Sequence, residues 1–184
     1  MKILMISQYY YPEPFRHTDI CEELVKRGHE VTAVVGVPNY PMGRIYPQYR
    51  RGQKRDEVIH GVKVHRCFTI GRRKNVLFRV LNYYSYDLAA QHYIRKMKEE
   101  FDVIFVNQLS PVLMAEPAIQ YKKKHGTPIV LYCLDLWPES LIAGWIDRKS
   151  YVYRYFHWVS RTIYHQVDQI LATSRSFADY FVYQ

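Results

Sequence analysis

Residues 129–140, IVLYCLDLWPES, decide the fold of this chain. The segment begins with a short apolar run, which is typical of a strand buried on both faces in a parallel sheet. Asp135 and Glu139 follow that run, and open α/β sheets bind their ligands just beyond the carboxyl ends of the strands. Pro138 lacks a backbone donor and disfavours a helical conformation at Trp137, so the chain turns before a helix can begin. The segment predicts two carboxylates and an indole at a sheet edge, although helix capping and core packing would account for each residue alone.

On both sides of this stretch, predicted strands and helices alternate along the chain. Apolar runs predict strands at residues 2–7, 30–35, 62–68, 102–106, 129–134 and 169–173. Periodic apolar positions and capping residues predict helices at residues 17–27, 72–98, between 110 and 126, at 148–167 and from 174 onward. Residues 36–52 contain three prolines and no periodicity, which indicates a long functional or mobile loop. The alternation predicts an α/β fold: a doubly wound, mostly parallel, Rossmann-like sheet with helices on both faces.

Two of the predicted helices carry basic and aromatic side chains beside an apolar stripe. In residues 72–98 one helical stripe consists of Leu77, Leu81, Tyr84 and Leu88, continued by Ile94 and Met97. The rest of that helix carries Arg72, Arg73, Lys74, Arg79, Tyr83, Tyr86 and Tyr93. In residues 148–167 the expected core stripe is Val152, Tyr155, Phe156, Val159, Ile163 and Val167, and a second stripe is Arg154, Trp158, Arg161 and His165. Such a second face is either solvated or lies on an anionic bilayer, and the pattern leaves both possibilities open.

Composition limits the class of protein. A chain of 184 residues suits one domain with its own core. The formal net charge of +9 indicates an anionic partner: nucleic acid, an anionic membrane face or a phosphorylated ligand. Three scattered cysteines without metal-ligand spacing indicate a reducing, cytoplasmic compartment. No segment approaches the ~20 apolar residues of a membrane-spanning helix, so we expect any membrane contact to be peripheral.

Polar residues follow the predicted strands and define a candidate binding site. Because the carboxyl ends of parallel strands meet at one edge, the loops after them come together there. The candidate residues are Glu13, Arg16, Asn39, Tyr40, Arg44, Asn107, Gln108, Ser110, Asp135 and Glu139. Amides, carboxylates and aromatic rings suit a polyhydroxylated ligand, and arginine suits phosphate. A sugar phosphate, or a sugar on a lipid diphosphate, matches both, although any α/β sheet has some polar residues at this edge.

Common catalytic and cofactor motifs do not occur in the sequence. There is no GxSxG, Walker loop or HExxH, and no GxGxxG follows the first strand. The eight histidines are dispersed and form no convincing pair of metal ligands. We therefore expect no bound cofactor and no metal.

Several stretches carry a family resemblance that covers nearly the whole chain. They are KILMISQYYYPEP (residues 2–14), ELVKRGHEVTAVVGVPNYPMGRIY (23–46), HGVKVHR (60–66), LYCLDLWPES (131–140) and YHQVDQILATSRSF (164–177). With these motifs the chain resembles the N-terminal domain of family 4 glycosyltransferases, the retaining GT-B enzymes. The resemblance is strongest to bacterial members that build O-antigen and capsular polysaccharides.

The resemblance implies that residues 1–184 are the acceptor-binding half of a two-domain GT-B fold. A C-terminal domain that binds the nucleotide-sugar would lie outside this chain, and the chain alone would be inactive. The implied enzyme is a retaining hexosyl- or N-acetylhexosaminyltransferase that needs no metal. Its implied acceptor is a glycan or a sugar on a polyprenyl diphosphate, used at the cytoplasmic face of the cell membrane, and the implied process is synthesis of a cell-surface polysaccharide.

Two positions depart from the family pattern. Where many relatives carry a glycine pair that admits a donor phosphate, this chain has Pro14, Phe15 and Arg16, so the arginine charge would replace backbone amides. Where other relatives have a histidine, this chain has Asn107 and Gln108. Asp135 is then the best-placed acid or base. In a retaining enzyme whose leaving phosphate takes the proton, its implied role is to position the acceptor hydroxyl.

Two alternatives remain open at this point. A different GT-B enzyme, such as a nucleotide-sugar epimerase, would release an altered sugar nucleotide and form no glycosidic bond. A non-catalytic nucleic-acid-binding module would use the positive charge, but the basic residues are spread over many segments and no RNP, KH or zinc-finger pattern occurs.

Overall fold

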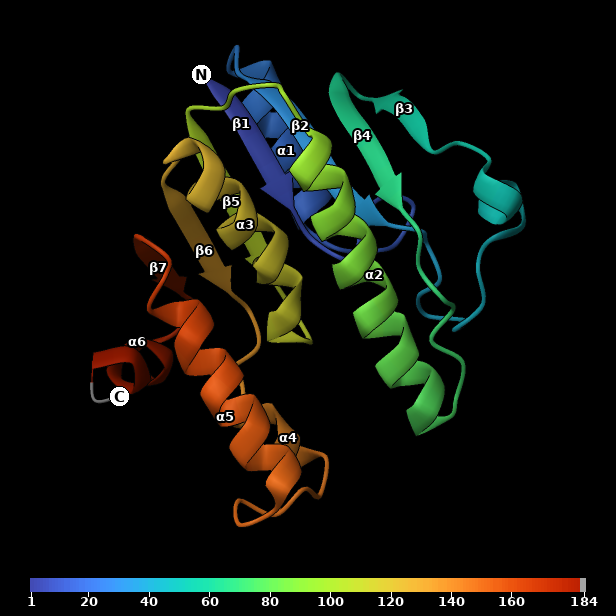
Figure 1. Cartoon of the computed structure of the whole chain (residues 1–184). Helices are drawn as coiled ribbons and strands as arrows, with labels where there is room; N and C mark the ends of the chain where they lie inside the picture. Colours follow the sequence, from blue (N-terminus) through green and yellow to red (C-terminus); the bar gives the residue numbers. More distant parts are fainter. Residues whose placement is uncertain (183–184) are drawn as a thin grey trace.

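The computed structural model describes residues 1–182, in which strands and helices alternate (Figure 1). The strands are β1 (Lys2–Ile6), β2 (Glu30–Gly36), β3 (Asp56–Ile59), β4 (Val62–Cys67), β5 (Val103–Gln108), β6 (Ile129–Cys133) and β7 (Gln169–Ala172). The α-helices are α1 (His17–Lys26), α2 (Val76–Lys96), α3 (Glu116–His125), α4 (Ser140–Ala143), α5 (Tyr151–Tyr164) and α6 (Arg175–Val182). Two short 3₁₀ helices are η1 (Pro47–Gly52) and η2 (Val112–Ala115). The segment predicted as one helix between residues 110 and 126 is therefore divided between η2 and α3.

Within residues 1–182 the strands form one seven-stranded sheet in the order β3-β4-β2-β1-β5-β6-β7. Every neighbouring pair is parallel except β3 with β4. The parallel strands end at one edge, where Gln108 stands opposite Cys133. Leu134 still donates its backbone N–H to the Gln108 carbonyl at 2.9 Å, so Asp135 follows the last ladder bond at this edge, beside Gln108 and Ser110. The predicted doubly wound, mostly parallel sheet is confirmed.

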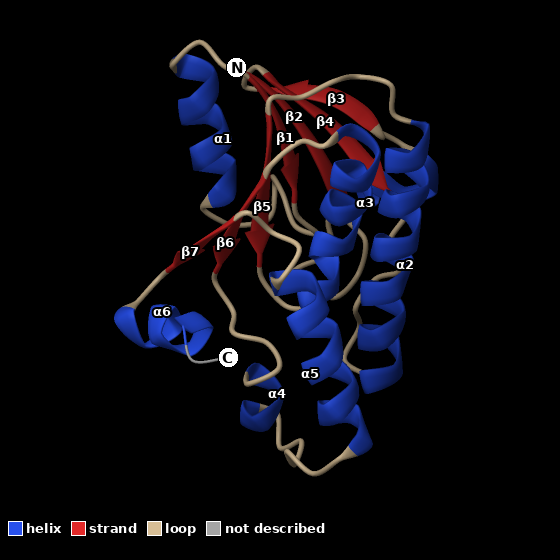
Figure 2. Ribbon diagram, turned by 60° about the vertical axis from the view of Figure 1, so that its left-hand side comes forward, coloured by secondary structure: helices blue, strands red, loops and turns tan. Residues whose placement is uncertain are grey.

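Helices cover both faces of this sheet (Figure 2). On one face α1 packs its Cys21 into a buried cluster with Ile3 and Met5 of β1. On the other face α2, α3 and α5 share a larger buried cluster with Leu4 and Ile6 of the same strand. Successive side chains of a strand point to opposite faces. A strand covered by helices on both faces therefore has an uninterrupted apolar sequence, and this run predicts the strand.

The edge strand β3 is not predicted by the apolar pattern. Its sequence DEVI is mostly exposed, and it pairs only with β4, in an antiparallel hairpin. The hairpin turns at Gly61, whose φ is +85° and where a Cβ atom would come within 2.7 Å of Val25 Cγ1. Glycine is therefore required at this turn. A strand with one partner and little buried surface leaves only a weak hydrophobic signal.

The apolar stripe of α2 is buried only at its C-terminal end. Ile94 and Met97 are buried, whereas the side chains of Leu77, Leu81 and Leu88 are 60%, 38% and 61% exposed. The buried residues of the helix are Asn82, Tyr83, Tyr86, Asp87, Ala90 and Ile94. Asn82 and Tyr86 donate hydrogen bonds to backbone carbonyls of the β4–α2 loop and of β2. Hydrophobic periodicity does not indicate this buried face, because it cannot show polar partners supplied by distant segments.

The other amphipathic helix, α5, follows its prediction in part. Val159 and Ile163 are buried as expected, whereas Val152 and Tyr155 are exposed. The second stripe (Arg154, Trp158, Arg161 and His165) is exposed throughout.

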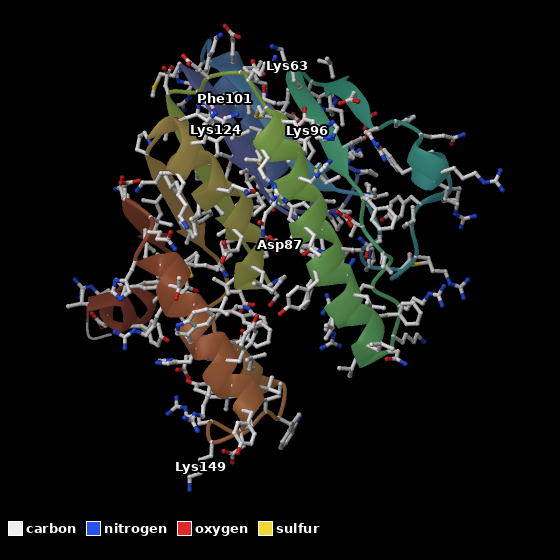
Figure 3. The ribbon with its side chains drawn as sticks, viewed as in Figure 1. Lys63, Asp87, Lys96, Phe101, Lys124 and Lys149 are labelled. Atoms are coloured by element: carbon white, nitrogen blue, oxygen red, sulfur yellow. The ribbon has the colours of Figure 1, made fainter. Side chains whose placement is uncertain are left out.

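Asp87 is a buried carboxylate of α2 on the side that faces α3 (Figure 3). Its two oxygens accept hydrogen bonds from Gln91 Nε2 at 2.9 and 3.0 Å. Burial raises the pKa of Asp87 to about 7, although the Gln91 hydrogen bond lowers it, and the nearby Glu116 adds to the rise. The folded protein therefore binds this proton more tightly than the unfolded chain does.

The variant Asp87→Asn is expected to be more stable than the wild type at pH 8 and equally stable near pH 4. Below the unfolded pKa of about 4 the carboxyl is neutral in both states, so its contribution to stability is fully present. As the pH rises through about 7, the folded wild type must ionise a buried group. The free energy of unfolding of the wild type then falls by about 2–4 kcal/mol, a loss that the asparagine variant does not suffer. Urea denaturation at both pH values measures the difference, with the exposed Asp179→Asn as control, and an equal effect of the two substitutions would contradict the prediction.

Candidate functional site

A cavity of about 290 Å³ lies at the carboxyl edge of the sheet. Its lining residues come from the loops after β1, β2, β4, β5 and β6, that is, from five segments far apart in sequence. They are Tyr9, Phe15, Tyr40, Arg72, Leu109, Ser110, Leu134 and Asp135. The cavity thus combines an aromatic and apolar wall with one carboxylate, one guanidinium and the hydroxyl groups of Tyr9, Tyr40 and Ser110.

Asp135 is held by one of its two carboxylate oxygens. Oδ2 accepts hydrogen bonds from Trp137 Nε1 at 2.9 Å and from the hydroxyl of Ser110. Gln108 Nε2 donates to the Asp135 backbone carbonyl at 2.8 Å and fixes the main chain at the same point. Within residues 1–182 the other oxygen, Oδ1, accepts no hydrogen bond. Asp135 therefore presents a fixed, free acceptor oxygen to a ligand.

The buried indole of Trp137 supports the Asp135 carboxylate. Trp137 is 4% exposed and packs edge-on against Phe156 of α5, with ring centroids 5.0 Å apart. Its backbone N–H lies 3.4 Å from the hydroxyl of Tyr164, also on α5. The turn predicted from Pro138 thus serves to seat the indole on α5, with its N–H directed at Asp135.

Three aromatic rings form the opposite wall. Phe15 lies 5.0 Å from Tyr9 and 5.1 Å from Tyr40 between ring centroids, and Tyr9 meets Tyr40 edge-on at 6.2 Å. Burial raises the pKa of Tyr9 well above its usual value, so its hydroxyl stays neutral. Such a wall suits the C–H face of a sugar ring.

Glu13 does not line the cavity, but it holds the loops that carry the aromatic wall. The residue is 3% exposed. Its Oε1 accepts the backbone N–H groups of Asn39 and Tyr40 at 2.8 and 2.7 Å, and its Oε2 accepts that of Tyr10 at 3.2 Å. Burial raises the pKa of Glu13 to about 7, against the three N–H groups, which lower it. One buried carboxylate thus joins the loops after β1 and β2.

Arg72 supplies the positive charge of the cavity. Its backbone N–H donates to Asn39 Oδ1 at 3.1 Å, and its guanidinium lies 5.8 Å from the ring centre of Tyr83. The buried Asn39 also donates from Nδ2 to the Val37 carbonyl at 2.9 Å, so its side chain joins the loops after β2 and β4. Sequence patterns assigned Arg72 to the polar face of a helix and missed it as a site residue. The available signal was Gly71, which separates it from the preceding strand.

Asn107 and Gln108 lie beneath the cavity and are fully buried. Asn107 Nδ2 is 3.0 Å from His17 Nδ1, and His17 Nε2 is 2.5 Å from the Tyr9 carbonyl. Burial lowers the pKa of His17 to about 4, so the ring is neutral, accepts from Asn107 and donates to Tyr9. These groups set the position of the first loop.

The structure therefore sorts the ten predicted site residues into three groups. Tyr40, Ser110 and Asp135 line one cavity, as predicted. Four of the others are buried, do not line the cavity and hydrogen-bond within these loops: Glu13, Asn39, Asn107 and Gln108.

Three predicted residues lie outside the cavity. Arg44 lines a neighbouring hollow. Glu139 is turned away and binds Arg148 at 2.7 Å and the Tyr153 hydroxyl at 2.8 Å, which corrects its predicted place beside Asp135. Arg16 is exposed at the start of α1.

Among residues 1–182, no three histidine, cysteine, aspartate or glutamate side chains gather in a way that could hold a metal ion.

An open, mostly parallel sheet with a polar cavity at the carboxyl ends of its strands defines a Rossmann-like ligand-binding domain. The sequence pattern of the glycosyl transferase 4-like domain matches residues 16–183, and the chain belongs to this family.

Among solved structures, MurG from Acinetobacter baumannii is similar, with a TM-score of 0.40 and 13% sequence identity over 71% of this chain and 34% of that chain. This chain thus spans about a third of the length of that MurG chain. No curated protein matches the sequence significantly.

Proposed function

We propose that this chain is the acceptor-binding half of a retaining glycosyltransferase. The enzyme transfers a hexose or N-acetylhexosamine from a nucleotide-sugar to a lipid-linked glycan acceptor during synthesis of a cell-surface polysaccharide. The observation that carries the proposal is the free oxygen of Asp135, held in an aromatic-walled cavity that also contains Arg72. Membership of the glycosyl transferase 4-like domain family supports it.

Each part of the cavity has a role in this proposal. The more exposed rings of the wall, Phe15 and Tyr40, stack on the acceptor sugar, and the buried Tyr9 supports them. In the bound state Asp135 Oδ1 accepts the hydrogen bond of the reacting hydroxyl and orients it. As the hydroxyl oxygen bonds to the donor sugar and the sugar–phosphate bond breaks, the proton moves to the departing phosphate. Arg72 attracts the phosphate group that is linked to the acceptor sugar. The nucleotide-sugar is bound by a second domain that is not part of this chain, and neither half uses a metal.

The partner proposed beside the acceptor is the anionic cytoplasmic face of the cell membrane. The N-terminal ends of α2 and α5 both project beyond the carboxyl edge of the sheet, where Lys149 marks the tip near α5 (Figure 3). Exposed apolar and aromatic residues gather on these ends: Val76, Leu77, Val80, Leu81, Trp145, Tyr151, Val152, Tyr155 and Trp158. Cations lie among them, and such a mixture favours the interface of an anionic bilayer.

Among residues 1–182 no helix is long and apolar enough to cross a bilayer. In the proposed membrane contact, the exposed side chains at the N-terminal ends of α2 and α5 lie on the bilayer surface. The acceptor cavity is at the same, carboxyl edge of the sheet.

One vesicle experiment tests both parts of the proposal. The chain is floated with anionic phosphatidylglycerol vesicles, with and without a polyprenyl diphosphate that carries one N-acetylhexosamine. We expect binding to the plain vesicles and a further increase with the acceptor lipid. Trp158→Ser should lower both, because it removes an exposed anchor, whereas Arg72→Ala should remove only the increase. Lys26→Ala, an exposed cation at the far end of α1, is the control. An acceptor lipid that adds nothing to wild-type binding would contradict the acceptor assignment.

A further inference from the structure

A second hollow adjoins the acceptor cavity, between residues 39–46 and 70–74. It has a volume of about 970 Å³ and is lined by Pro41, Met42, Gly43, Arg44, Ile45, Arg50, Gly71, Arg73 and Lys74. Tyr40 and Arg72 line the acceptor cavity, and the next residue of each loop lines the hollow. The two spaces therefore follow one another along the same pair of loops.

Two glycines allow these loops to touch through their backbones. The Arg73 N–H donates to the Gly43 carbonyl at 2.8 Å. A Cβ at Gly43, whose φ is +69°, would lie 2.9 Å from the Arg73 nitrogen, and one at Gly71 would lie 2.9 Å from the Gly43 carbonyl oxygen. Any side chain at either position would push the loops apart. The hollow is thus built by a specific backbone contact.

The hollow gathers positive charge without an acidic partner. Arg44, Arg50, Arg73 and Lys74 line it, no carboxylate does, and within residues 1–182 none of the four forms an ion pair. Two of them are nevertheless held in place. The Arg73 guanidinium stacks over the ring of Phe78 at 4.2 Å, and Arg50 Nε donates to the Ile45 carbonyl at 3.3 Å. Like charges that line one hollow repel one another, so the arrangement favours a multiply charged anion among them.

We propose that this hollow binds a diphosphate group, and that its occupant is the diphosphate of the acceptor lipid. The second part rests on the proposed function. Guanidinium groups present paired donors that match phosphate oxygens, and several of them can share the charges of two linked phosphates. Arg72 lines the acceptor cavity, and the next residue, Arg73, lines the hollow. One ligand can therefore place its sugar in the cavity and its diphosphate in the hollow. Met42, 76% exposed at the rim, offers apolar surface where the lipid chain leaves.

Inorganic pyrophosphate is the probe, because it has neither sugar nor lipid. Calorimetric titration of the 184-residue chain at low salt should show binding that weakens as the chloride concentration rises. The double variant Arg44→Ala/Arg73→Ala is expected to raise the Kd at least about 30-fold, since each contact to a charged phosphate oxygen is a strong one. The matched control is Arg95→Ala/Lys98→Ala, which removes the same charge from exposed positions at the other end of α2 and should leave the Kd nearly unchanged.

Thermal melts show whether the double variant folds, and Lys74→Gln gives a milder test if it does not. The proposal is overturned if pyrophosphate does not bind, or if the control variant loses as much affinity as the double variant. Plain phosphatidylglycerol vesicles separate the two sources of phosphate. If the double variant loses vesicle binding while pyrophosphate binds to neither protein, the hollow is a headgroup contact and the diphosphate proposal fails. Pyrophosphate binding with no response to the acceptor lipid would leave the diphosphate site in place and remove only the acceptor assignment.

Discussion

Asparagine in place of Asp135 is expected to lower kcat/KM for sugar transfer by about 100- to 1000-fold while leaving the fold intact. The asparagine carbonyl oxygen can still accept the hydrogen bonds that Trp137 and Ser110 donate to Oδ2. The amide NH₂ then takes the place of Oδ1 and offers the acceptor hydroxyl a donor where it needs an acceptor. The hydroxyl consequently turns its proton away from residue 135 and its lone pair away from the donor sugar.

Initial rates at several acceptor concentrations, in the full-length enzyme that the proposal requires, measure this loss. Donor affinity should not change, because the proposed donor contacts lie in the other half. Asp147→Asn is the matched control: it makes the same chemical change on an exposed turn of the α4–α5 connection. Unchanged turnover of Asp135→Asn would remove this residue from the reaction.

Alanine in place of Glu13 is expected to destabilise the protein by about 2–4 kcal/mol at pH 7 and to abolish most acceptor binding. The change leaves the N–H groups of Tyr10, Asn39 and Tyr40 buried without their acceptor. Tyr40 lines the cavity, and the residues after it line the adjoining hollow. Loss of this one carboxylate therefore displaces both sites.

Urea denaturation gives the change in stability, and flotation with acceptor-containing vesicles gives the change in binding. Glu23→Ala is the control, because Glu23 lies on the surface of α1 in an exposed pair with Arg27, worth only about 0.3–0.5 kcal/mol. Glu13→Gln should fall between the two, since its oxygen can serve Asn39 and Tyr40 while its NH₂ opposes the Tyr10 N–H. A Glu13→Ala variant as stable as Glu23→Ala would show that this carboxylate does not hold the loops.

The sequence predicted where the candidate site lies, but only some of the residues that line it. Asp135, Ser110 and Tyr40 directly follow strands or begin the next element, so topology alone brings them to the cavity. Arg72 was missed because it begins a basic run before a long helix and resembles the polar face of that helix. Glu13 was expected to contact the ligand because the sequence shows its carboxylate and not the three N–H groups that surround it.

By itself the sequence determined the mostly parallel sheet, the edge at which its loops meet and the order of the strands and helices, apart from the edge strand β3 and the short helices η1, η2 and α4. These features follow from apolar runs and from turn residues such as Gly28 and Pro138, whose effects act within a few residues of the chain. Only the tertiary structure decided which polar side chains line the cavity, which lie buried beneath it, and which face of α2 meets the sheet. Those outcomes depend on hydrogen-bond partners far along the chain, such as His17 for Asn107 and Asn39 for Glu13. Most polar groups are buried where such a partner meets them, and these contacts form only once the loops have folded together.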